Sequence, residues 1–203
     1  MTTSSKQLTS KLWVIGLAGT NGSGKDTVGK ILADHHNYLF ISVTEILRNE
    51  ARKRGLPVER EILRNISAEW RRELGLGVLV DAAVAQYETV RDKYSGVVIA
   101  SIRNPGEANR IHELGGTMVW VDAAPRVRYD RVQANIASRG QRTEDQKTFE
   151  EFLSEEAAEM QFTGDTATLN MKGVKDRCDA FPRNDTSDLE LFRKDIELSL
   201  GLA

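Results

Sequence analysis

A glycine-rich turn near the start of the chain combines the residue types that bind phosphate. It lies in GLAGTNGSGKDT (16–27), directly after an apolar run. Glycines in such a turn can take positive φ and direct several backbone N–H groups to one concave side. Lys25 adds a positive charge, and a helix beginning beside it would direct its positive dipole end to the same place. We therefore expect the turn to bind an anion, most simply a phosphate.

The spacing of this turn is that of the nucleotide-binding P-loop. Four residues separate Gly19 from Gly24, Lys25 follows directly, and a strand before and a helix after form the context that the motif requires. The alternative is a glycine-rich hairpin turn with an incidental lysine. The residues expected to bind ATP are Gly19, Asn21, Gly22, Ser23, Gly24, Lys25, Asp26 and Thr27.

Length and composition are typical of a single globular domain. A chain of 203 residues can bury a sizeable core without a second domain. No apolar stretch approaches the roughly 20 residues of a membrane span, and the polar first ten residues lack the apolar centre of a secretory signal. We expect a flexible tail at 1–10, one domain over 11–203, a cytoplasmic location and no membrane partner. Cys178 is the only cysteine, which excludes an internal disulfide.

The charged residues favour small anionic ligands over nucleic acid. The net charge of −2 lacks the basic excess that supplies affinity for nucleic acid. Arginine nevertheless provides 18 of the 28 basic residues, and its planar fork matches phosphate oxygens. Several arginines are expected only to solvate helix faces: Arg52, Arg54, Arg60, Arg64, Arg91 and Arg193.

Short apolar runs alternate with helical periods along the chain. The runs at 12–18, 38–42, 96–101 and 117–122 are typical of strands covered on both faces. The stretch 179–185 is expected to add a short edge strand, a place where proline is tolerated. This alternation predicts an α/β fold with a doubly wound, parallel, five-stranded sheet that binds ligands at the carboxyl ends of its strands.

Helical periods fill most of the remaining chain, and three of them fall between the second and third strands. The stretch 162–175 shows no clear period. Helices are expected after Lys25 and at 43–54, 59–74, 78–91, 106–114, 125–138, 148–160 and 187–200.

The stretch ISVTEILR (41–48), at this distance after the P-loop, resembles the corresponding part of adenylate kinases. The chain is thus similar to nucleoside monophosphate kinases, and GKDT (24–27) matches a variant of phage-type deoxynucleoside monophosphate kinases. EARKRGLPVERE, RRELG and TFEEF most resemble adenylate-kinase-related proteins described as dephospho-CoA kinase-like. The resemblance spans about residues 12–160. It implies a P-loop NTPase fold with a helical acceptor-binding region at about 43–92 and a short lid at about 139–147.

The resemblance also implies roles for residues outside the P-loop. By this resemblance, the residues that would bind the acceptor are Ser42, Thr44, Glu45, Arg48, Arg71 and Arg103. Arginines late in the helix after the fourth strand and in the lid would act on the transferring phosphoryl group, although helix and loop arginines are also common as solvated residues. The catalytic set is then Lys25, Arg103, Arg131, Arg139 and Arg142.

One position departs from the pattern of these kinases. They usually end the third strand with an aspartate that holds magnesium through water, whereas this strand ends in Ala100 and Ser101. The resemblance therefore implies that Mg²⁺ is held by substrate phosphates together with Thr27 and Asp26. Glu45 and Asp122 are further candidate carboxylates.

These residues favour ATP-dependent phosphoryl transfer to a nucleoside monophosphate. If the acceptor is instead the ribose hydroxyl of dephospho-CoA, a carboxylate base would help, and Glu45 or Asp26 is nearest. A regulatory protein that holds nucleotide without turnover is the third reading, which the missing aspartate favours slightly and the two separate arginine sets oppose. A GTPase switch is disfavoured because no guanine-reading Asn/Thr-Lys-x-Asp stretch follows a strand. The sequence leaves the acceptor's base and sugar and the oligomeric state open.

Overall fold

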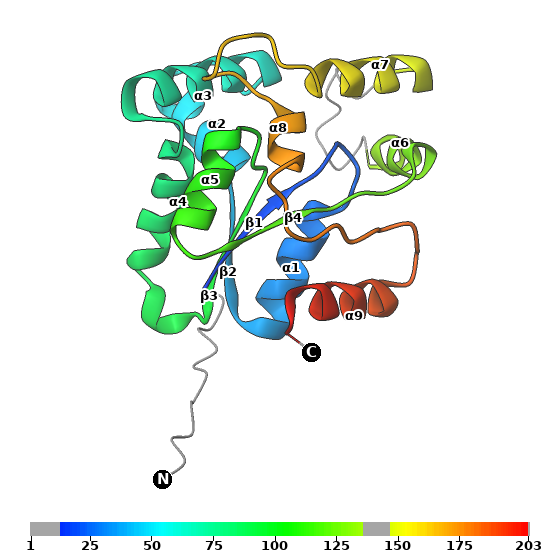
Figure 1. Cartoon of the computed structure of the whole chain (residues 1–203). Helices are drawn as coiled ribbons and strands as arrows, with labels where there is room; N and C mark the ends of the chain where they lie inside the picture. The colour runs from blue at the N-terminus through cyan, green and yellow to red at the C-terminus, as the bar shows by residue number, and fades with distance from the viewer. Residues whose placement is uncertain (1–12, 136–146, 203) are drawn as a thin grey trace.

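A parallel sheet of four strands forms the centre of this computed structural model, which describes residues 13–135 and 147–202 (Figure 1). The strands are β1 (Val14–Ala18), β2 (Tyr38–Ser42), β3 (Gly96–Ala100) and β4 (Thr117–Trp120), in the order β2-β3-β1-β4. All residues of β1 and β3 are buried, which explains why both strands are unbroken apolar runs. The predicted α/β fold with a doubly wound parallel sheet is confirmed.

The predicted fifth strand is wrong as a regular strand. Residues 179–185 do run beside β4, but they join its edge only through two isolated parallel bridges, Val119 to Ala180 and Asp122 to Arg183. Pro182 interrupts the ladder because it has no N–H to donate, although its carbonyl accepts a hydrogen bond from the Asp122 N–H at 3.2 Å.

Helices occupy the segments that the sequence predicts, and α8 lies in the stretch without a clear period. None of the helices in the described part of the chain is long and apolar enough to cross a membrane. The predicted tail at 1–10 and the predicted lid, with Arg139 and Arg142, fall outside the described residues, apart from Lys147 at the end of the lid. The helices are α1 (Lys25–His36), α2 (Val43–Lys53), α3 (Arg60–Leu74), α4 (Val78–Glu88), η1 (Arg91–Lys93), α5 (Pro105–Glu113), α6 (Pro125–Ala134), α7 (Phe149–Glu159), α8 (Met171–Lys175) and α9 (Leu189–Leu200).

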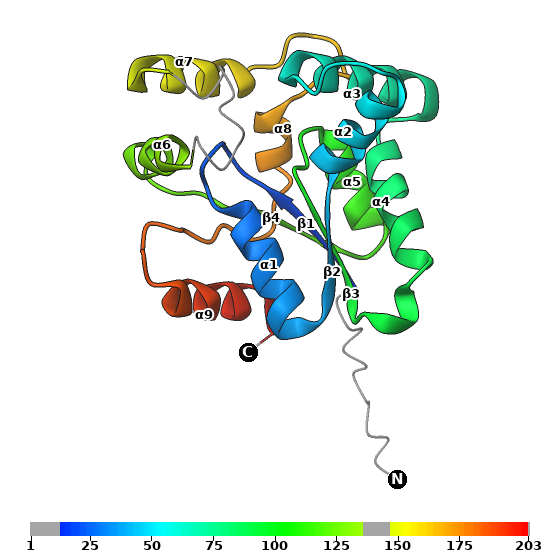
Figure 2. The same ribbon diagram turned by 180° about the vertical axis from the view of Figure 1, so that it is seen from behind.

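Helices cover both faces of the sheet, so the core has two halves (Figures 1 and 2). On one face Val14, Ile99 and Trp120 pack against apolar residues of α2, α3, α4, α5 and α8. On the other face Leu17 and Val98 pack against α1 and α9. Alternate residues of each strand thus enter opposite halves of the core, which fixes the sheet between its helical layers.

The strand order creates a crevice at the carboxyl ends of β1 and β3. These two strands are neighbours, but the chain leaves β1 toward β2 at one edge of the sheet and leaves β3 toward β4 at the other edge. Loops that diverge in this way leave a space between them, the usual ligand site of open α/β sheets. Here the P-loop follows β1, and Ser101 to Arg103 follow β3.

Candidate active site

The P-loop is pressed closely against the chain that follows β4. Gly19, Gly22 and Gly24 have φ values of 146°, 78° and 94°, in the region that favours glycine. A Cβ at Gly22 would come within 2.4 Å of the Arg128 carbonyl oxygen. A side chain at position 22 is therefore excluded both by backbone conformation and by space, so the loop has one tightly defined course.

Asn184, from the bridged segment beside β4, holds the end of the P-loop. Its buried amide Nδ2 donates to the Ser23 carbonyl at 3.0 Å, and its own N–H donates to the Asp122 carbonyl at 2.7 Å. Arg131 donates in turn to the Asn184 carbonyl at 2.8 Å. Arg131 thus supports the P-loop through Asn184, and its predicted contact with a donor nucleotide stays a prediction.

The first turn of α1 lies at the wall of a pocket. Gly24 is the N-cap, and no side chain caps this helix in the described part of the chain. The N-terminal amides of a helix have no partners within the helix and attract anions. Lys25, Asp26 and Asn21 line a pocket at this point, so charge and amides face the same space.

A large basic pocket extends from the P-loop to α2, α3 and the loop after β3. Its volume is about 970 Å³. In a chain of net charge −2, its lining holds twice as many cationic as acidic side chains, which favours an anionic ligand. The cations are Lys25, Lys30, Arg48, Arg60, Arg64, Arg71, Arg72 and Arg103, and the acids are Asp26, Glu45, Glu69 and Glu73.

The structure brings the predicted acceptor residues into this pocket. Ser42, Thr44, Glu45 and Arg48 line it from the end of β2 and the first turns of α2, and Lys25 lines it from the start of α1. Arg48 forms an ion pair with Glu45, one turn earlier on α2. The donor loop and the predicted acceptor arginine thus share one cavity.

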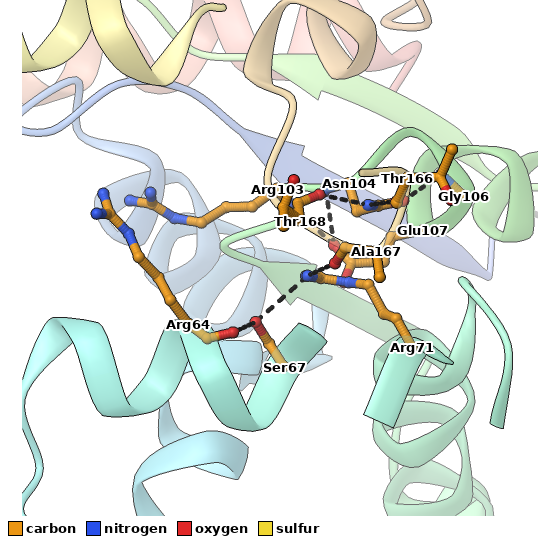
Figure 3. A network of polar contacts seen from close by, with 10 residues as sticks. All are labelled: Arg64, Ser67, Arg71, Arg103, Asn104, Gly106, Glu107, Thr166, Ala167 and Thr168. Atoms are coloured by element: carbon orange, nitrogen blue, oxygen red, sulfur yellow. Dashed lines mark hydrogen bonds and ion pairs between the residues drawn. The ribbon is translucent and has the colours of Figure 1, made fainter. Parts of the chain in front are cut away.

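Arg71 is buried and holds the framework of the pocket (Figure 3). Its Nε and Nη2 donate to Glu107 Oε1 at 3.0 and 2.7 Å, and its Nη1 donates to the Ala167 carbonyl at 2.9 Å. The other oxygen of Glu107 accepts the backbone N–H of Arg103 at 2.9 Å. Arg71 therefore fixes the loop that carries Arg103, and its predicted contact with the acceptor stays a prediction.

Asn104 and Glu107 also hold the framework of the pocket, a role that the sequence analysis did not predict. Asn104 is the N-cap of α5 in a capping box with Glu107, and its Nδ2 also donates to the carbonyls of Thr166 and Thr168 at 2.8 Å each (Figure 3). The sequence Asn-Pro-Gly-Glu (104–107) carries the signal for such a box, a capping residue followed three positions later by glutamate.

Arg103 lies in an ion-pair cluster with residues of α3 and α7. Its Nη1 donates to Glu159 Oε2 at 3.2 Å, and Arg64 Nη2 donates to Glu159 Oε1 at 2.7 Å. Arg60, also on α3, lies 3.6 Å from Glu155, which is on α7 like Glu159. Arg64 is exposed, as expected of a helix-face arginine, but Arg60 and Arg64 also line the pocket and contact carboxylates of α7, which the sequence did not predict. No sequence pattern around Glu159 indicates its role, because its partners are distant in the chain.

Burial and the arginines act in opposite directions on Glu159. Burial raises the pKa of its carboxyl, but the charges of Arg103, Arg60 and Arg64 lower it more, and the net effect puts the pKa below the ordinary value. The carboxylate is therefore ionised at neutral pH, as the ion pairs require.

Ser101 occupies the position where the resembled kinases carry an aspartate. It is buried at the end of β3 with φ of 71°, which is unusual for a residue other than glycine. In the described ranges, no group of three or more His, Cys, Asp or Glu could hold a metal. Asp26 and Thr27 remain as a carboxylate and a hydroxyl on the first turn of α1. Such a pair suits Mg²⁺ held mainly by substrate phosphates and water.

The other two candidate carboxylates are already engaged. Asp122 Oδ1 accepts the Ala123 N–H at 2.8 Å and lies 3.7 Å from Arg128 Nε. Glu45 pairs with Arg48. Asp26 is thus the candidate that lines the pocket without a contact of this kind.

Solved structures share the fold of this chain. Shikimate kinase from Bacteroides thetaiotaomicron superposes with a TM-score of 0.56 at 17% identity, covering 94% of this chain and 99% of that one. A putative kinase from Chloroflexus aurantiacus gives a TM-score of 0.51 at 16% identity, covering 94% and 97%. At these identities the likeness concerns the fold, which is that of P-loop kinases.

Sequence relatives identify the family. A UPF0200 protein from Pyrococcus abyssi is 30% identical over 190 residues, 91% of this chain and 94% of its own length. One from Pyrobaculum aerophilum is 29% identical over 90% of this chain and 94% of its own length. The AAA domain family matches residues 15–161. The chain therefore belongs to the AAA domain family and to the UPF0200 family.

Proposed function

We propose that this protein transfers a phosphoryl group from ATP to a nucleoside monophosphate. The observation that carries the proposal is that the P-loop and the arginines Arg48 and Arg103 line the same pocket. A donor bound at the loop would have its terminal phosphate directed into the space where a second anion would bind. ATP as the donor also suggests a cytoplasmic location.

The charge of the pocket supports a phosphorylated acceptor. Arginine side chains reach it from α2, from α3 and from the loop after β3, and arginine forks bind phosphate through paired hydrogen bonds. These arginines already contact carboxylates, so a phosphate would share or take over such ion pairs, which a neutral acceptor could not do. The volume of about 970 Å³ is ample for a nucleotide.

The residues around the pocket fit the needs of phosphoryl transfer, which are alignment, charge stabilisation and exclusion of water. Lys25 and the loop amides would bind the β and γ phosphates of the donor, while Arg48 and Arg103 would orient the acceptor. Asp26 and Thr27 would hold Mg²⁺, which when bound neutralises charge on the donor phosphates. An anionic acceptor phosphate needs no general base. The proposed roles of Arg131, Arg139 and Arg142 are to stabilise the transferring group.

Dephospho-CoA as the acceptor makes a different demand. Its ribose hydroxyl would need a base, and the carboxylate of Glu45 already pairs with Arg48. Asp26, exposed on the first turn of α1, would have to serve. The pairing of Glu45 therefore favours the monophosphate over the hydroxyl acceptor.

Product formation with a panel of acceptors tests the proposal. ATP and Mg²⁺ are supplied with each common ribonucleoside and deoxynucleoside monophosphate and, separately, with dephospho-CoA. We expect diphosphate product from at least one monophosphate. Product formed only from dephospho-CoA would identify dephospho-CoA as the acceptor in place of a monophosphate. ATP binding without any product would favour the regulatory alternative.

A further inference from the structure

Helix α7 places carboxylates on the arginines that surround the basic pocket. Five of its eleven residues are glutamate and none is basic. Glu156 accepts Arg128 Nη2 at 2.8 Å, Glu155 lies 3.6 Å from Arg60, and Glu159 contacts both Arg64 and Arg103. The helix thus meets arginines of α3, α6 and the loop after β3 at once.

The cluster around Glu159 resembles an anion site that is already filled. Figure 3 shows the guanidinium groups of Arg64 and Arg103 extending to the same place from different elements. One Glu159 oxygen contacts Arg64 at 2.7 Å and the other contacts Arg103 at 3.2 Å. A phosphomonoester, which also presents several oxygens to a pair of arginines, would use the same donors.

Two further features indicate that Glu159 can leave these arginines. It is the last residue of α7, where the helix dipole disfavours a negative charge, and the ion pairs with Arg64 and Arg103 stabilise it there. Phe152 is the one residue of α7 that is buried. A helix with so little buried apolar surface is held largely by its ion pairs with other elements, and such pairs can exchange partners at a small free-energy change.

We propose that Arg64 and Arg103 together bind the acceptor's phosphate and that Glu159 occupies their site as an internal competitor until the acceptor displaces it. This inference rests on the proposed function for the identity of the acceptor. It adds Arg64 to the acceptor site and makes Glu159 a residue that lowers acceptor affinity. Since both arginines line the large pocket, the displaced carboxylate and the incoming phosphate would exchange places at its wall.

Titration with inorganic phosphate tests this exchange without turnover. Phosphate binding is measured by calorimetry for the parent, Glu159→Gln, the matched control Glu150→Gln and the double variant Glu159→Gln with Arg64→Gln. Glu150 is exposed and lies nine residues before Glu159 on α7, about 13 Å away along the axis. Any binding at the P-loop is common to all four proteins, so the differences report on the arginine site.

Removing the competing charge should strengthen binding. Since one hydrogen bond to a charged group is worth about tenfold or more in an equilibrium, we expect Glu159→Gln to bind phosphate at least about tenfold more tightly than the parent. Glu150→Gln should match the parent, and the double variant should lose the gain. Thermal melting of each variant confirms that it is folded.

Equal or weaker phosphate binding by folded Glu159→Gln would overturn the proposal, because it would mean that Glu159 only holds the arginines in position. A gain that persists in the double variant would overturn the role of Arg64. The outcome is independent of the kinase assay: an inactive parent whose Glu159→Gln variant gains phosphate affinity contradicts the proposed function alone, whereas an active parent without that gain contradicts this inference alone.

Discussion

The proposed donor and acceptor sides of the pocket are held in place by different kinds of interaction. On the donor side, Gly22 lies against the Arg128 carbonyl and Asn184 donates to the Ser23 carbonyl. Both contacts involve the backbone. On the acceptor side, backbone contacts of Arg71 and Glu107 hold the loop that carries Arg103, but the Arg103 side chain itself is positioned by an ion pair with Glu159. Backbone contacts fix one geometry, whereas ion pairs can exchange partners, so we expect a rigid donor loop facing an adaptable acceptor site.

The largest expected effect comes from removing the donor-side charge. Lys25→Ala should lower turnover by about a thousandfold or more, in the range of transition-state contacts in phosphoryl transfer, while the fold persists because the side chain is outside the core. Steady-state kinetics and thermal melting measure the two effects. Lys172→Ala, at an exposed α8 position paired with Asp176, is the control. Turnover close to that of the parent would refute the P-loop assignment.

The buried pair of the acceptor side should matter most for stability. Arg71 and Glu107 are 3% and 0% exposed, and breaking one member of a buried pair costs about 3–5 kcal/mol. We expect Glu107→Gln to lose that much free energy of unfolding in urea. The control is Glu113→Gln on the same helix, where the partner Arg110 is partly exposed. A loss below about 1 kcal/mol, the value for surface pairs, would contradict a framework role for Glu107.

Asn184→Ala should have a smaller effect, confined to the donor side. It leaves the Ser23 carbonyl without its side-chain donor, and an unsatisfied buried group costs about 1–3 kcal/mol. ATP affinity, measured by calorimetry, should weaken while phosphate binding at the acceptor arginines is retained. Asn109→Ala, which removes an exposed amide that accepts a hydrogen bond from Arg177, two residues after α8, is the control. An unchanged ATP affinity would mean that the P-loop keeps its shape without Asn184.

Acid should weaken the acceptor side, where the carboxylate of Glu159 holds the arginines. The pKa of Glu159 lies below its ordinary value of 4.5, because the three arginines outweigh burial. A lowered carboxyl pKa stabilises the fold above the unfolded pKa, and that stability is lost as pH falls through the folded pKa. Between pH 6 and about 3, Glu159→Gln should therefore lose less stability than the parent, by at most about 1.4 kcal/mol per pH unit. Parallel curves for the two proteins would contradict this.

The sequence predicts the donor side well because the P-loop is a local motif. The glycine spacing, the lysine and the strand and helix around them all lie within residues 14–36, and the backbone conformation follows from glycine itself. The strands are equally readable, since β1 and β3 are buried on both faces and so appear as unbroken apolar runs. The prediction of a fifth strand is wrong because Pro182 has no backbone N–H to donate to the hydrogen-bond ladder of the sheet.

The acceptor side was harder to predict because its contacts are distant in the chain. Arg64 and Glu159 are 95 residues apart, and Arg71 and Glu107 are 36 apart. No periodicity links such residues, so Arg64 reads as a solvated helix arginine and Glu159 as an ordinary helix acid. Asn104 and Glu107 are different, because their capping box is local and its spacing is visible in the sequence.

The central claim is that one pocket binds ATP on one wall and a phosphorylated acceptor on the other. The most direct test combines ATP calorimetry with steady-state kinetics at varied acceptor for the parent, Arg103→Ala and the control Arg91→Ala, an exposed arginine paired with Glu88. We predict that Arg103→Ala raises the acceptor's KM and lowers turnover by about tenfold or more while ATP affinity stays within about twofold. Weakened ATP binding with unchanged acceptor kinetics would contradict the account.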